Sequence, residues 1–519
     1  MAREEEIIKE RKKKIEELQK QGINPYAYSF DRTHLAQQLQ EKWAKLENEK
    51  EVKESVRVCG RVMSVRDMGQ INFISLEDGF GRIQLIFKDK ISSEIKKIDA
   101  GDFIGVEGTI FRTKRGELSI LVTKAEILTK AILPLPEKFH GLQDMEERYR
   151  KRYLDLLSNP KSKEVFITRT KVIQGIREFL DSRGYLEVET PILQPIYGGG
   201  AAQPFKTFFN DLKQEVYLRV ADELYLKRLI IGGFERVYEI GKDFRNESID
   251  LKHNPEFTQV ELYQAYADYN DMAKLFEDLM AFLAKKVLGT TKFEYQGHKL
   301  DFGKWRHATM HDIIKEHLKV EVEKMSDKEL FELAEKLGID KVSKKSPRGE
   351  IINELFESVA DKMIEPTIVK DYPLETCPLC KISRTKKGII ERFEPTCCGL
   401  ELGNSYSELN DPILQRTLLE GQVKDRKNEA EPWTSELDED FINAMEHGMP
   451  PTGGIGIGVD RIVMLLTNSA SIRDVIFFPF MKAEKTPDEN KKIAGYYSGM
   501  LIDDAKKTLE VKKTEKIKK

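Results

Sequence analysis

The sequence predicts an α+β protein in which a small five-stranded β-barrel precedes a large domain of strands and helices. Five short β-rich segments lie close together between residues 52 and 128. From residue 164 onward, amphipathic helical patterns are mixed with strand-like runs that recur to about residue 459. Because these two patterns occupy different parts of the chain, they indicate a barrel and a separate α+β domain.

Residues 1–50 are predicted to form a charged helical extension. A thin apolar stripe with helical spacing includes Ile7, Ile15 and Leu18, and "QGINPYAYSF" interrupts it as a turn. Two interpretations remain open, a solvated helix and a basic helix that lies on nucleic acid.

Residues 51–130 are predicted to form an OB-fold barrel. Its five strand-like segments are "VRVCGRVMSVRD", "NFISLED", "GRIQLIFK", "DFIGVEGTIFRT" and "ELSILVTKAEIL", with the helix-like "KISSEIKKID" between the third and the fourth. Such barrels bind single-stranded nucleic acid by stacking bases on aromatic rings beside basic groups. The candidate groups are Arg61, Arg66, Phe73, Arg82 and Phe87. Burial in the barrel core is a better explanation for Phe87 than for Phe73.

Residues 131–163 are predicted to be a linker, since "ILPLPEKFHGL" contains two prolines and shows no periodicity. The large domain is expected over residues 164–483. It opens with an amphipathic helix that ends at Gly184. The lysine-rich segment 484–519 is predicted to be a flexible appendage.

Within the large domain the elements follow from their periodicity. Strands are expected at 185–193, 216–220, 235–245, 257–267, 389–397, 401–409 and 453–459, and helices at 271–287, 326–337 and 349–362.

One hairpin in this domain has an unusually long and charged loop. The segment "FRNESIDLKHNPEF" (244–257) separates two strand-like runs, although most hairpin loops need only two to five residues. A loop of this length between well-defined strands is expected to be functional rather than disordered.

The strands beside this loop carry residues that suit a binding surface better than a core. Residues two apart share a face of a strand, so Phe257, Glu261 and Tyr263 point the same way, with Arg245 across the hairpin. A second strand repeats the arrangement with Asn404, Tyr406 and Glu408, and Glu394 and Glu401 add carboxylates upstream. These groups suit a cationic ligand together with a phosphate–metal complex, although any one of these glutamates alone could be a solvated surface residue.

The segment "GGIGIGVDRIVMLL" (453–466) places four glycines directly before a helix that begins with Asp460 and Arg461. Glycines allow the backbone to approach a flat ligand, and Arg461 supplies positive charge at the start of the helix. The glycine spacing differs from the G-x-G-x-x-G dinucleotide fingerprint, and a packing strand is the alternative explanation.

Composition excludes several classes of protein. Lys plus Arg (85) nearly balances Asp plus Glu (88), so the chain as a whole carries no nucleic-acid signal. The N-terminus lacks the apolar region of a secretory signal, and no apolar run approaches the length of a membrane span. Five cysteines, four of them clustered, argue against a disulfide scaffold. A cytosolic protein with no membrane and no DNA partner is expected.

Several of these segments together resemble the class II lysyl-tRNA synthetases of subclass IIb. "GYLEVETPIL", "FRNESIDLKHNPEFTQVELYQAYADY" and "GIGIGVDRIVMLLTNSASIRDVIFFP" are similar to the three motifs that define class II. "ADELYLKRLIIGGFERVYEIG" and "ERFEP…ELGNSYSELNDP" resemble the segments that separate the lysine enzymes from their aspartate and asparagine relatives. The resemblance implies a class II antiparallel-sheet catalytic domain, a homodimer and a tRNA(Lys) partner.

The resemblance also implies roles for single residues. It implies ATP binding by Arg245, Glu247, His253, Phe257, Glu401 and Arg461, with Arg245 and Arg461 catalytic. It implies lysine binding by Gly199, Glu223, Arg245, Glu261, Tyr263, Asn404, Tyr406 and Glu408, with Glu408 facing the ε-ammonium. Magnesium would be held by Glu394 and Glu401, and the anticodon read by Arg66, Phe73, Gln84 and Glu117.

Rival functions fit the residues less well. An aspartate or asparagine enzyme would need a basic residue where this chain has Glu261 and Glu408. A relative that lysylates a protein is expected to lack the barrel, and a non-catalytic RNA-binding paralogue would be free to lose Arg245, Glu401 or Arg461. The chain departs from many members of the family in having Gln203 in place of an arginine.

A second departure is the "CPLC" segment, with Cys377 and Cys380, and sixteen residues separate it from Cys397 and Cys398. A lysine-glycine turn between them suits a hairpin that would bring the two pairs together, and four gathered thiolates suit tetrahedral zinc. The alternatives are four buried or idle thiols, and a disulfide.

Overall fold

The computed structural model describes residues 2–136, 142–200, 202–427 and 437–483. The chain divides into two compact units, Met1–Gln143 and Asp144–Lys519. The flexible appendage predicted at 484–519 lies outside the described residues. In the described part of the chain no helix is long and apolar enough to cross a membrane.

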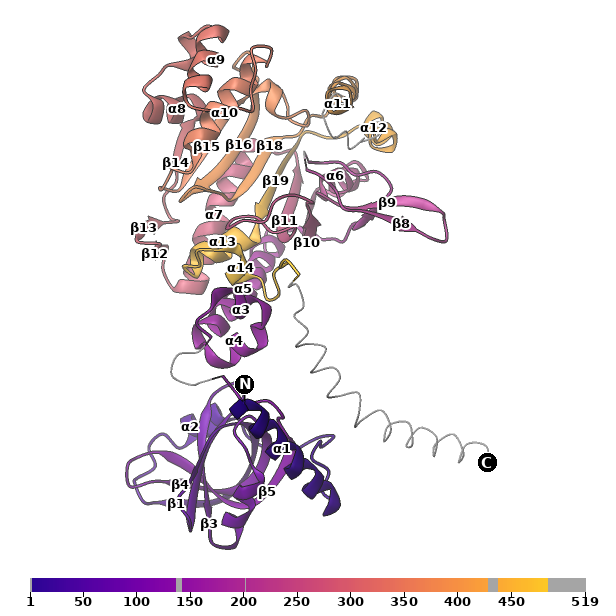
Figure 1. The fold of residues 1–519 in the computed structure, drawn as a ribbon. Coiled ribbons are helices and arrows are strands. Elements are labelled where there is room, and N and C mark those ends of the chain that lie inside the picture. The colour runs from indigo at the N-terminus through magenta and orange to yellow at the C-terminus, as the bar shows by residue number, and fades with distance from the viewer. Residues whose placement is uncertain (1, 137–141, 201, 428–436, 484–519) are drawn as a thin grey trace. The chain divides into compact units, whose positions relative to one another are not determined.

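The first unit is the predicted barrel with two helices at its N-terminus (Figure 1). The strands close in the order β1-β2-β3-β5-β4, with β3 and β5 parallel. Their bounds are β1 (Glu51–Asp67), β2 (Ile71–Glu77), β3 (Arg82–Lys88), β4 (Phe103–Arg112) and β5 (Leu118–Thr129), and the helix-like segment is the 3₁₀ helix η1 (Asp89–Lys97). Phe87 is fully buried in the barrel whereas Phe73 is half-buried, as predicted.

The N-terminal extension packs on the barrel instead of projecting from it. It forms α1 (Ala2–Lys20) and α2 (Ala36–Lys42), separated by the predicted turn. Arg11 of α1 is buried and donates to the carbonyl oxygens of Ala100, Ala131 and Leu133, at 2.8 Å, 3.1 Å and 2.9 Å. Leu18 is buried as well. The apolar stripe that predicted the helix is therefore its contact surface with the barrel.

The second unit contains the predicted α+β domain. Its main sheet has nine strands, in the order β14-β15-β16-β18-β19-β11-β10-β6, with β17 paired to β16. The strands of this unit are β6 (Leu186–Glu187), β7 (Leu193–Gln194), β8 (Lys206–Phe209), β9 (Gln214–Leu218), β10 (Arg236–Phe244), β11 (Glu256–Ala265), β12 (Lys292–Tyr295), β13 (His298–Asp301), β14 (Arg306–Thr309), β15 (Thr367–Pro373), β16 (Ile389–Cys397), β17 (Leu400–Glu401), β18 (Gly403–Ser407) and β19 (Thr452–Gly458).

Helices lie against both faces of this sheet. They are α3 (Met145–Arg150), α4 (Arg152–Ser158), α5 (Pro160–Asp181), α6 (Glu223–Ile231), α7 (Tyr269–Leu288), α8 (Met310–Leu318), α9 (Asp327–Lys336), α10 (Arg348–Ala360), α11 (Pro412–Lys427), α12 (Glu439–Glu446), α13 (Val459–Leu466) and α14 (Ile472–Val475). The main core joins α5, α7 and α13 to one face of the sheet, through residues such as Val260, Leu262, Ile455 and Ile457. A second core joins α8, α9 and α10 to β15 and β16, and Figure 1 shows these helices beside those strands.

Helices occupy part of the predicted linker. Residues 145–158 form α3 and α4, whereas the extended conformation was predicted from residues 132–142. The Asp144 side chain accepts from the backbone N–H of Glu147, which caps α3. Arg152 is fully buried, pairs with Asp155 and donates to the Phe477 carbonyl oxygen. These contacts join segments far apart in the chain, which is why the polar sequence alone gave no sign of them.

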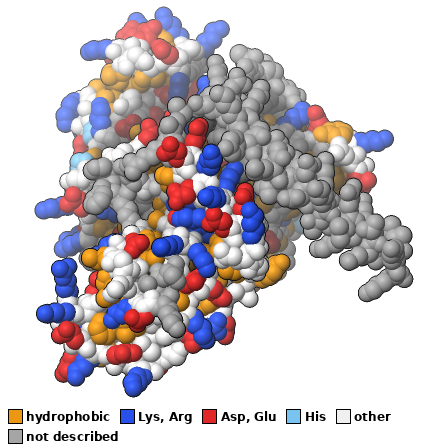
Figure 2. All heavy atoms as spheres, turned by 60° about the horizontal axis from the view of Figure 1, so that its bottom comes forward, with side chains coloured by type: hydrophobic (Ala, Val, Ile, Leu, Met, Phe, Trp, Pro, Cys, Tyr) orange, Lys and Arg blue, Asp and Glu red, His pale blue; other side chains and the backbone are white. Residues whose placement is uncertain are grey.

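Basic and acidic side chains are interspersed on the face shown in Figure 2, in keeping with the nearly balanced composition. One pairing in the barrel is unusual because it is fully buried. Lys130 Nζ lies 2.6 Å from Asp99 Oδ2 and 2.5 Å from Asp102 Oδ2, and the Lys130 and Asp102 side chains have no exposed surface.

We expect Lys130→Met to destabilise the barrel by about 3–5 kcal/mol, since it leaves buried carboxylate charge without its partner. Denaturant unfolding measures this loss. Lys124→Met is the matched control, because Lys124 pairs with Glu107 at 3.3 Å on the surface and such pairs contribute less than about 1 kcal/mol. Equal losses in the two variants would contradict the prediction.

Candidate active site

A cavity of about 260 Å³ lies over β11, β18 and β19, on the face opposite the main core. It gathers every residue that the resemblance assigned to ATP or lysine. These are Gly199, Glu223, Arg245, Glu247, His253, Phe257, Glu261, Tyr263, Glu401, Asn404, Tyr406, Glu408 and Arg461. The two strand faces predicted from a spacing of two therefore meet in one pocket.

The glycines of β19 create the space between these two faces. β19 lies between β11 and β18, so that Gly454 stands between Tyr263 and Tyr406. A Cβ on Gly454 would lie 2.2 Å from Glu408 Oε1 and 2.4 Å from a ring carbon of Tyr263. Ile455 alternates with these glycines and points into the core. One face of β19 is therefore apolar, and the glycines of the other face leave room for the pocket.

One end of the pocket is a cluster of buried carboxylates around a buried lysine. Glu223, Glu261 and Glu408 are 2%, 7% and 0% exposed, and Lys227 is 0% exposed. Lys227 Nζ lies 2.5 Å from Glu223 Oε1 and also pairs with Glu408 Oε2. Tyr406 donates its hydroxyl to Glu223 Oε2 at 2.8 Å. Lys227 is not among the residues singled out from the sequence, although its place four residues after Glu223 on one helix is the spacing of an ion pair.

The electrostatics of this end favour a cationic ligand. Burial raises the pKa of Glu261 to about 8, and the charge of Glu223 adds to the shift. Burial likewise raises the pKa of Glu408, against the attraction of Lys227. Burial lowers the pKa of Lys227, but Glu223 and Glu408 outweigh this effect and raise it. Three carboxylates facing one ammonium leave an excess of negative charge that an incoming ammonium group would relieve.

The other end of the pocket combines a guanidinium with an aromatic ring. Arg245 lies at the end of the long hairpin, and its guanidinium carbon is 5.1 Å from the centre of the Phe257 ring. Arg245 Nε is buried and has no hydrogen-bond partner among the described residues. A buried guanidinium N–H that faces a pocket is suited to a phosphate or carboxylate oxygen.

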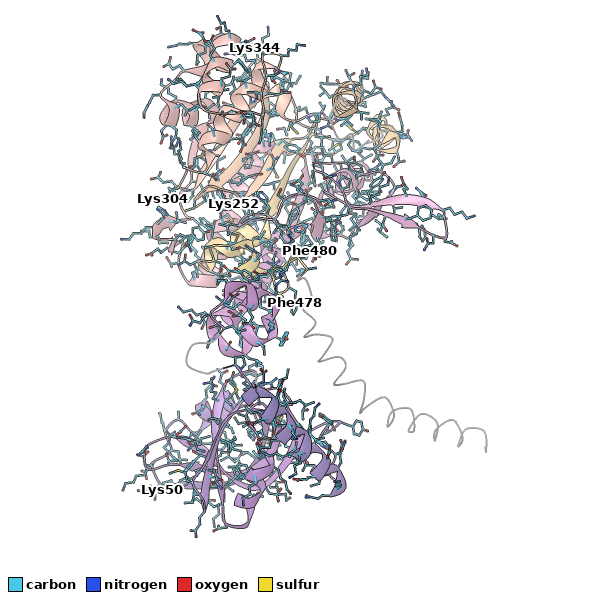
Figure 3. The ribbon with its side chains drawn as sticks, viewed as in Figure 1. Lys50, Lys252, Lys304, Lys344, Phe478 and Phe480 are labelled. Atoms are coloured by element: carbon cyan, nitrogen blue, oxygen red, sulfur yellow. The ribbon has the colours of Figure 1, made fainter. Side chains whose placement is uncertain are left out.

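Hydrogen bonds and an ion pair hold the long loop in place at several points, as its position between two well-defined strands predicted. Asp250 accepts from the backbone N–H groups of Lys252 and His253, which closes the tip of the loop. Lys252, labelled in Figure 3, pairs with Asp361 and donates to the Gly399 carbonyl oxygen at 2.9 Å. The loop therefore bridges its own hairpin and the rest of the domain.

Arg461 contacts two of the other groups assigned to ATP. Its Nη1 donates to the backbone oxygen of Glu401 at 2.5 Å and lies 3.7 Å from Glu401 Oε2. Its Nη2 lies 3.2 Å from His253 Nε2. The preceding residue, Asp460, accepts from Arg169 of α5 and from the Thr258 backbone N–H. The helix that carries Arg461 is thereby fixed to β11 and α5, a role of Asp460 and Arg169 that the sequence did not reveal.

Gln203, which departs from the family pattern, contacts the long loop through its backbone. Its carbonyl oxygen accepts from the Asn246 N–H at 2.8 Å, and its own N–H donates to Glu247 at 3.4 Å. Nearby, Gly199 has φ +80°, and a Cβ there would lie 3.1 Å from the Glu223 Cβ. A glycine at position 199 lets the backbone turn beside Glu223.

The two predicted magnesium ligands differ in their surroundings. Glu394 does not line the pocket; it is buried, pairs with Arg392 and accepts from the Tyr372 hydroxyl at 2.8 Å. Burial raises the pKa of Glu394 to about 7, with Arg392 opposing and Glu401 adding to the shift. Glu401 is on the neighbouring strand and lines the pocket. Magnesium keeps several waters and needs only one or two carboxylates besides phosphate oxygens, so Glu401 fits a phosphate-bound ion, whereas Glu394 is engaged by Arg392 and Tyr372.

The structure does not gather the four cysteines. The predicted hairpin forms, with Lys381 and Ser383 bonded to Glu391 and Ile389. Cys397 then lies six residues beyond Glu391, about 20 Å farther along a strand with a rise of ~3.3 Å per residue. Cys380 consequently packs in the second core and Cys397 in the main core. Among the described residues, no group of three or more His, Cys, Asp or Glu side chains is arranged to hold a metal. Of the interpretations left open for the cysteines, the zinc site is therefore wrong for this geometry, and all five cysteines are free thiols.

The barrel brings its predicted anticodon residues to one surface. Arg66 and Phe73 are directly opposite on β1 and β2, with the guanidinium carbon 5.5 Å from the ring centre. Arg66 Nη2 donates to Gln84 Oε1 at 3.0 Å, and Gln84 Nε2 donates to Ser119 Oγ at 3.0 Å. Ser119 Oγ in turn donates to the Glu117 carbonyl oxygen. A base stacked on Phe73 would thus meet polar groups from three strands.

Comparisons with known proteins agree with both units. Residues 144–482 match the family described as tRNA synthetases class II (D, K and N). Residues 56–128 match the OB-fold nucleic acid binding domain family named for the tRNA anticodon.

This chain is similar to lysine–tRNA ligases from several organisms over most of its length. The chain is 49% identical over 491 residues to the lysine–tRNA ligase of Clostridium novyi (strain NT), covering 92% of this chain and 95% of that relative. It is 49% identical over 497 residues to the lysine–tRNA ligase of Nostoc sp., covering 93% and 88%. It is 47% identical over 486 residues to that of Methanoculleus marisnigri, covering 92% and 95%. The chain therefore belongs to the class II tRNA synthetases of the D, K and N group and, within that group, to the lysine–tRNA ligases.

Proposed function

We propose that this enzyme binds lysine with its two ammonium groups in the carboxylate cluster and its carboxylate beside Arg245. The observation that carries the proposal is the division of one pocket into an anionic end and an Arg245–Phe257 end. Glu223 and Gly199 receive the α-ammonium, and Glu408, with Glu261 and Tyr263, receives the ε-ammonium. Adenine stacks on Phe257, and Glu247, His253, Glu401 and Arg461 hold the remainder of ATP.

The chemistry needs positioning and charge rather than a side-chain nucleophile. The lysine carboxylate attacks the α-phosphorus in line, a new O–P bond forms, and pyrophosphate leaves with the electrons of the broken bond. The terminal 3′-hydroxyl of tRNA then attacks the lysyl carbonyl, and AMP leaves. Arg245 stabilises charge on the α-phosphate and Arg461 on the outgoing phosphates. Magnesium, when bound by Glu394 and Glu401, would neutralise charge on the phosphate oxygens.

We also propose the partners that the family implies. The barrel surface around Phe73 reads the anticodon of tRNA(Lys). A second copy of the chain covers an apolar surface on the segment that resembles the first class II motif and on the adjoining strands. Its exposed residues are Leu186, Ile192, Leu193, Phe208 and Phe209. A cytoplasmic location belongs to the same proposal, because tRNA is charged where translation uses it.

The direct test is ATP–pyrophosphate exchange measured with each of the twenty amino acids. Exchange should depend on lysine, and aspartate and asparagine should support none. Exchange that depends on aspartate, or on no amino acid, would overturn the assignment.

We expect Glu408→Gln to lower kcat/KM for lysine by roughly two to four decades, while KM for ATP stays within about threefold. The variant removes a buried charge that faces an ammonium, a loss of about 3–5 kcal/mol. Asp155→Asn is the control, because Asp155 is an equally buried, arginine-paired carboxylate outside the pocket. Lysine kinetics of Glu408→Gln within threefold of the parent enzyme would refute the role of Glu408.

We expect Glu261→Gln to make the ligand-free enzyme more stable at high pH and less able to use lysine. The pKa of Glu261 is about 8 in the folded state and near 4.5 when unfolded, so the folded state holds the extra proton. The stability cost of ionising Glu261 therefore begins above pH 4.5 and is complete above pH 8. Unfolding in denaturant should show a gain of about 1–3 kcal/mol at pH 8.5 and little at pH 5. A gain that does not grow with pH would contradict this.

We expect Phe73→Ala to weaken tRNA charging by about 1–3 kcal/mol in kcat/KM for tRNA, the contribution of one stacked base. Lysine-dependent pyrophosphate exchange should not change. The matched control is Phe103→Ala, since Phe103 pairs with Arg61 on the same barrel at 4.2 Å but is not among the residues assigned to the anticodon. If exchange falls as far as charging, the barrel is not a separate anticodon reader.

A further inference from the structure

The resemblance gives Lys227 no role, yet Lys227 joins the two carboxylates at which the ammonium groups of the substrate are proposed to bind. Its side chain is fully buried at the centre of α6. Nζ lies 2.5 Å from Glu223 Oε1 and pairs at the same time with Glu408 Oε2. Glu223 comes from α6 and Glu408 from the residue after β18, so a single nitrogen connects two separate elements.

Both carboxylates keep one oxygen for the ligand. Glu408 Oε1 is buried, has no hydrogen-bond partner in the described part of the chain, and points to the empty Cβ position of Gly454. Glu223 Oε2 accepts only the Tyr406 hydroxyl among the hydrogen bonds seen in the structure. Lys227 thus holds each carboxylate by one oxygen and leaves the other turned towards the cavity.

Counted over the charged residues proposed to bind lysine, the charges match lysine only when Lys227 is included. Glu223, Glu261 and Glu408 contribute three negative charges when ionised, and Lys227 and Arg245 contribute two positive charges. The net charge of −1 complements lysine, which carries +1 overall. Without Lys227 the net charge would be −2, and the buried carboxylates would be neutralised by protons rather than by the substrate.

From this geometry, and resting on the proposed function, we infer that Lys227 is a positioning residue that sets the substrate specificity of the pocket. It fixes the separation between the α-ammonium site at Glu223 and the ε-ammonium site at Glu408. A diamino acid of a different length, such as ornithine, then reaches only one of the two sites. It also lowers the pKa of Glu408 against the effect of burial, which favours the charged carboxylate that receives the ε-ammonium.

Several titratable groups surround this ion pair. Tyr263 and Glu261 face it from β11, Tyr406 from β18, and Cys377 and Cys380 from the loop after β15. The positive charge of Lys227 lowers the pKa of Glu408, whereas burial and the charges of Glu223 and Cys377 raise it. Removing Lys227 should therefore shift the use of lysine to higher pH.

The test compares Lys227→Met, Lys227→Arg and Lys130→Met by lysine- and ornithine-dependent pyrophosphate exchange from pH 6 to 9. In Lys227→Met, KM for lysine should rise at least about tenfold, with KM for ATP within about threefold. Lysine and ornithine differ by one methylene, and a pocket discriminates such a difference by about 10–200-fold. In Lys227→Met this preference for lysine over ornithine should fall by about tenfold or more. The pH at which KM for lysine reaches its minimum should move upward.

The other variants separate positioning from stability. Lys227→Arg keeps the charge and should restore the pH profile, but not the full preference for lysine, because the longer side chain spaces the carboxylates differently. Lys130→Met removes an equally buried lysine from between two carboxylates in the barrel, so it should lower stability without changing KM for lysine, the preference or the pH profile.

The results distinguish this inference from the proposed function. If the unmutated enzyme shows no lysine-dependent exchange, the proposed function fails. If the unmutated enzyme is active and Lys227→Met leaves the lysine–ornithine ratio and the pH profile unchanged, only the role of Lys227 fails. If Lys227→Met does not fold, the Lys227→Arg ratio decides, and a ratio equal to that of the parent enzyme overturns the inference.

Discussion

The pocket exists because one strand in the middle of the catalytic sheet, β19, has glycines at three successive positions of one face, Gly454, Gly456 and Gly458. β19 presents Ile455 and Ile457 to the core and Gly454 and Gly456 to the cavity. Any Cβ on Gly454 would overlap Glu408 and Tyr263, so no other residue keeps both neighbouring strands in place. The two faces that bind the substrate can approach each other only across this gap, and the fold provides it by backbone pairing alone.

The buried carboxylates that line this pocket lower the stability of the folded protein. Three buried glutamates share one lysine, and the raised pKa values of Glu261 and Glu408 show that burial and mutual repulsion disfavour their charged forms. A second buried group, Arg219, pairs with Glu239 and Asp243, and Glu239 is directly opposite Glu261 in the β10–β11 pair. Buried ion pairs contribute little net stability, so the position of the Glu223–Lys227–Glu408 cluster in the pocket points to a role in recognition. The ligand supplies the missing charge, and the empty site is correspondingly strained.

Patterns within one strand or one helix were readable from the sequence. A spacing of two placed Glu261 with Tyr263 and Asn404 with Tyr406, and the structure puts all four in the cavity. Contacts between distant segments were not readable. The role of Lys227 depends on Glu408, which is 181 positions away, and α3 and α4 are stabilised by residues near 475. The hairpin that was expected to gather the cysteines formed, but its register carried Cys397 away from Cys380.

The long loop likewise combines residues placed by strand pairing with residues held only by side-chain contacts. Its ends are held by the β10–β11 ladder, where Arg245 N–H bonds the Pro255 carbonyl oxygen at 2.9 Å, so Arg245 and Phe257 are placed by rigid strands. The residues between them are held by side chains, chiefly Lys252 and His253, through bonds that lie at the surface. Surface contacts of this kind are weak individually and exchange readily with water. The site therefore joins a rigid part, which carries the groups proposed to bind lysine and the α-phosphate, to a loop whose contacts can be remade when a ligand binds.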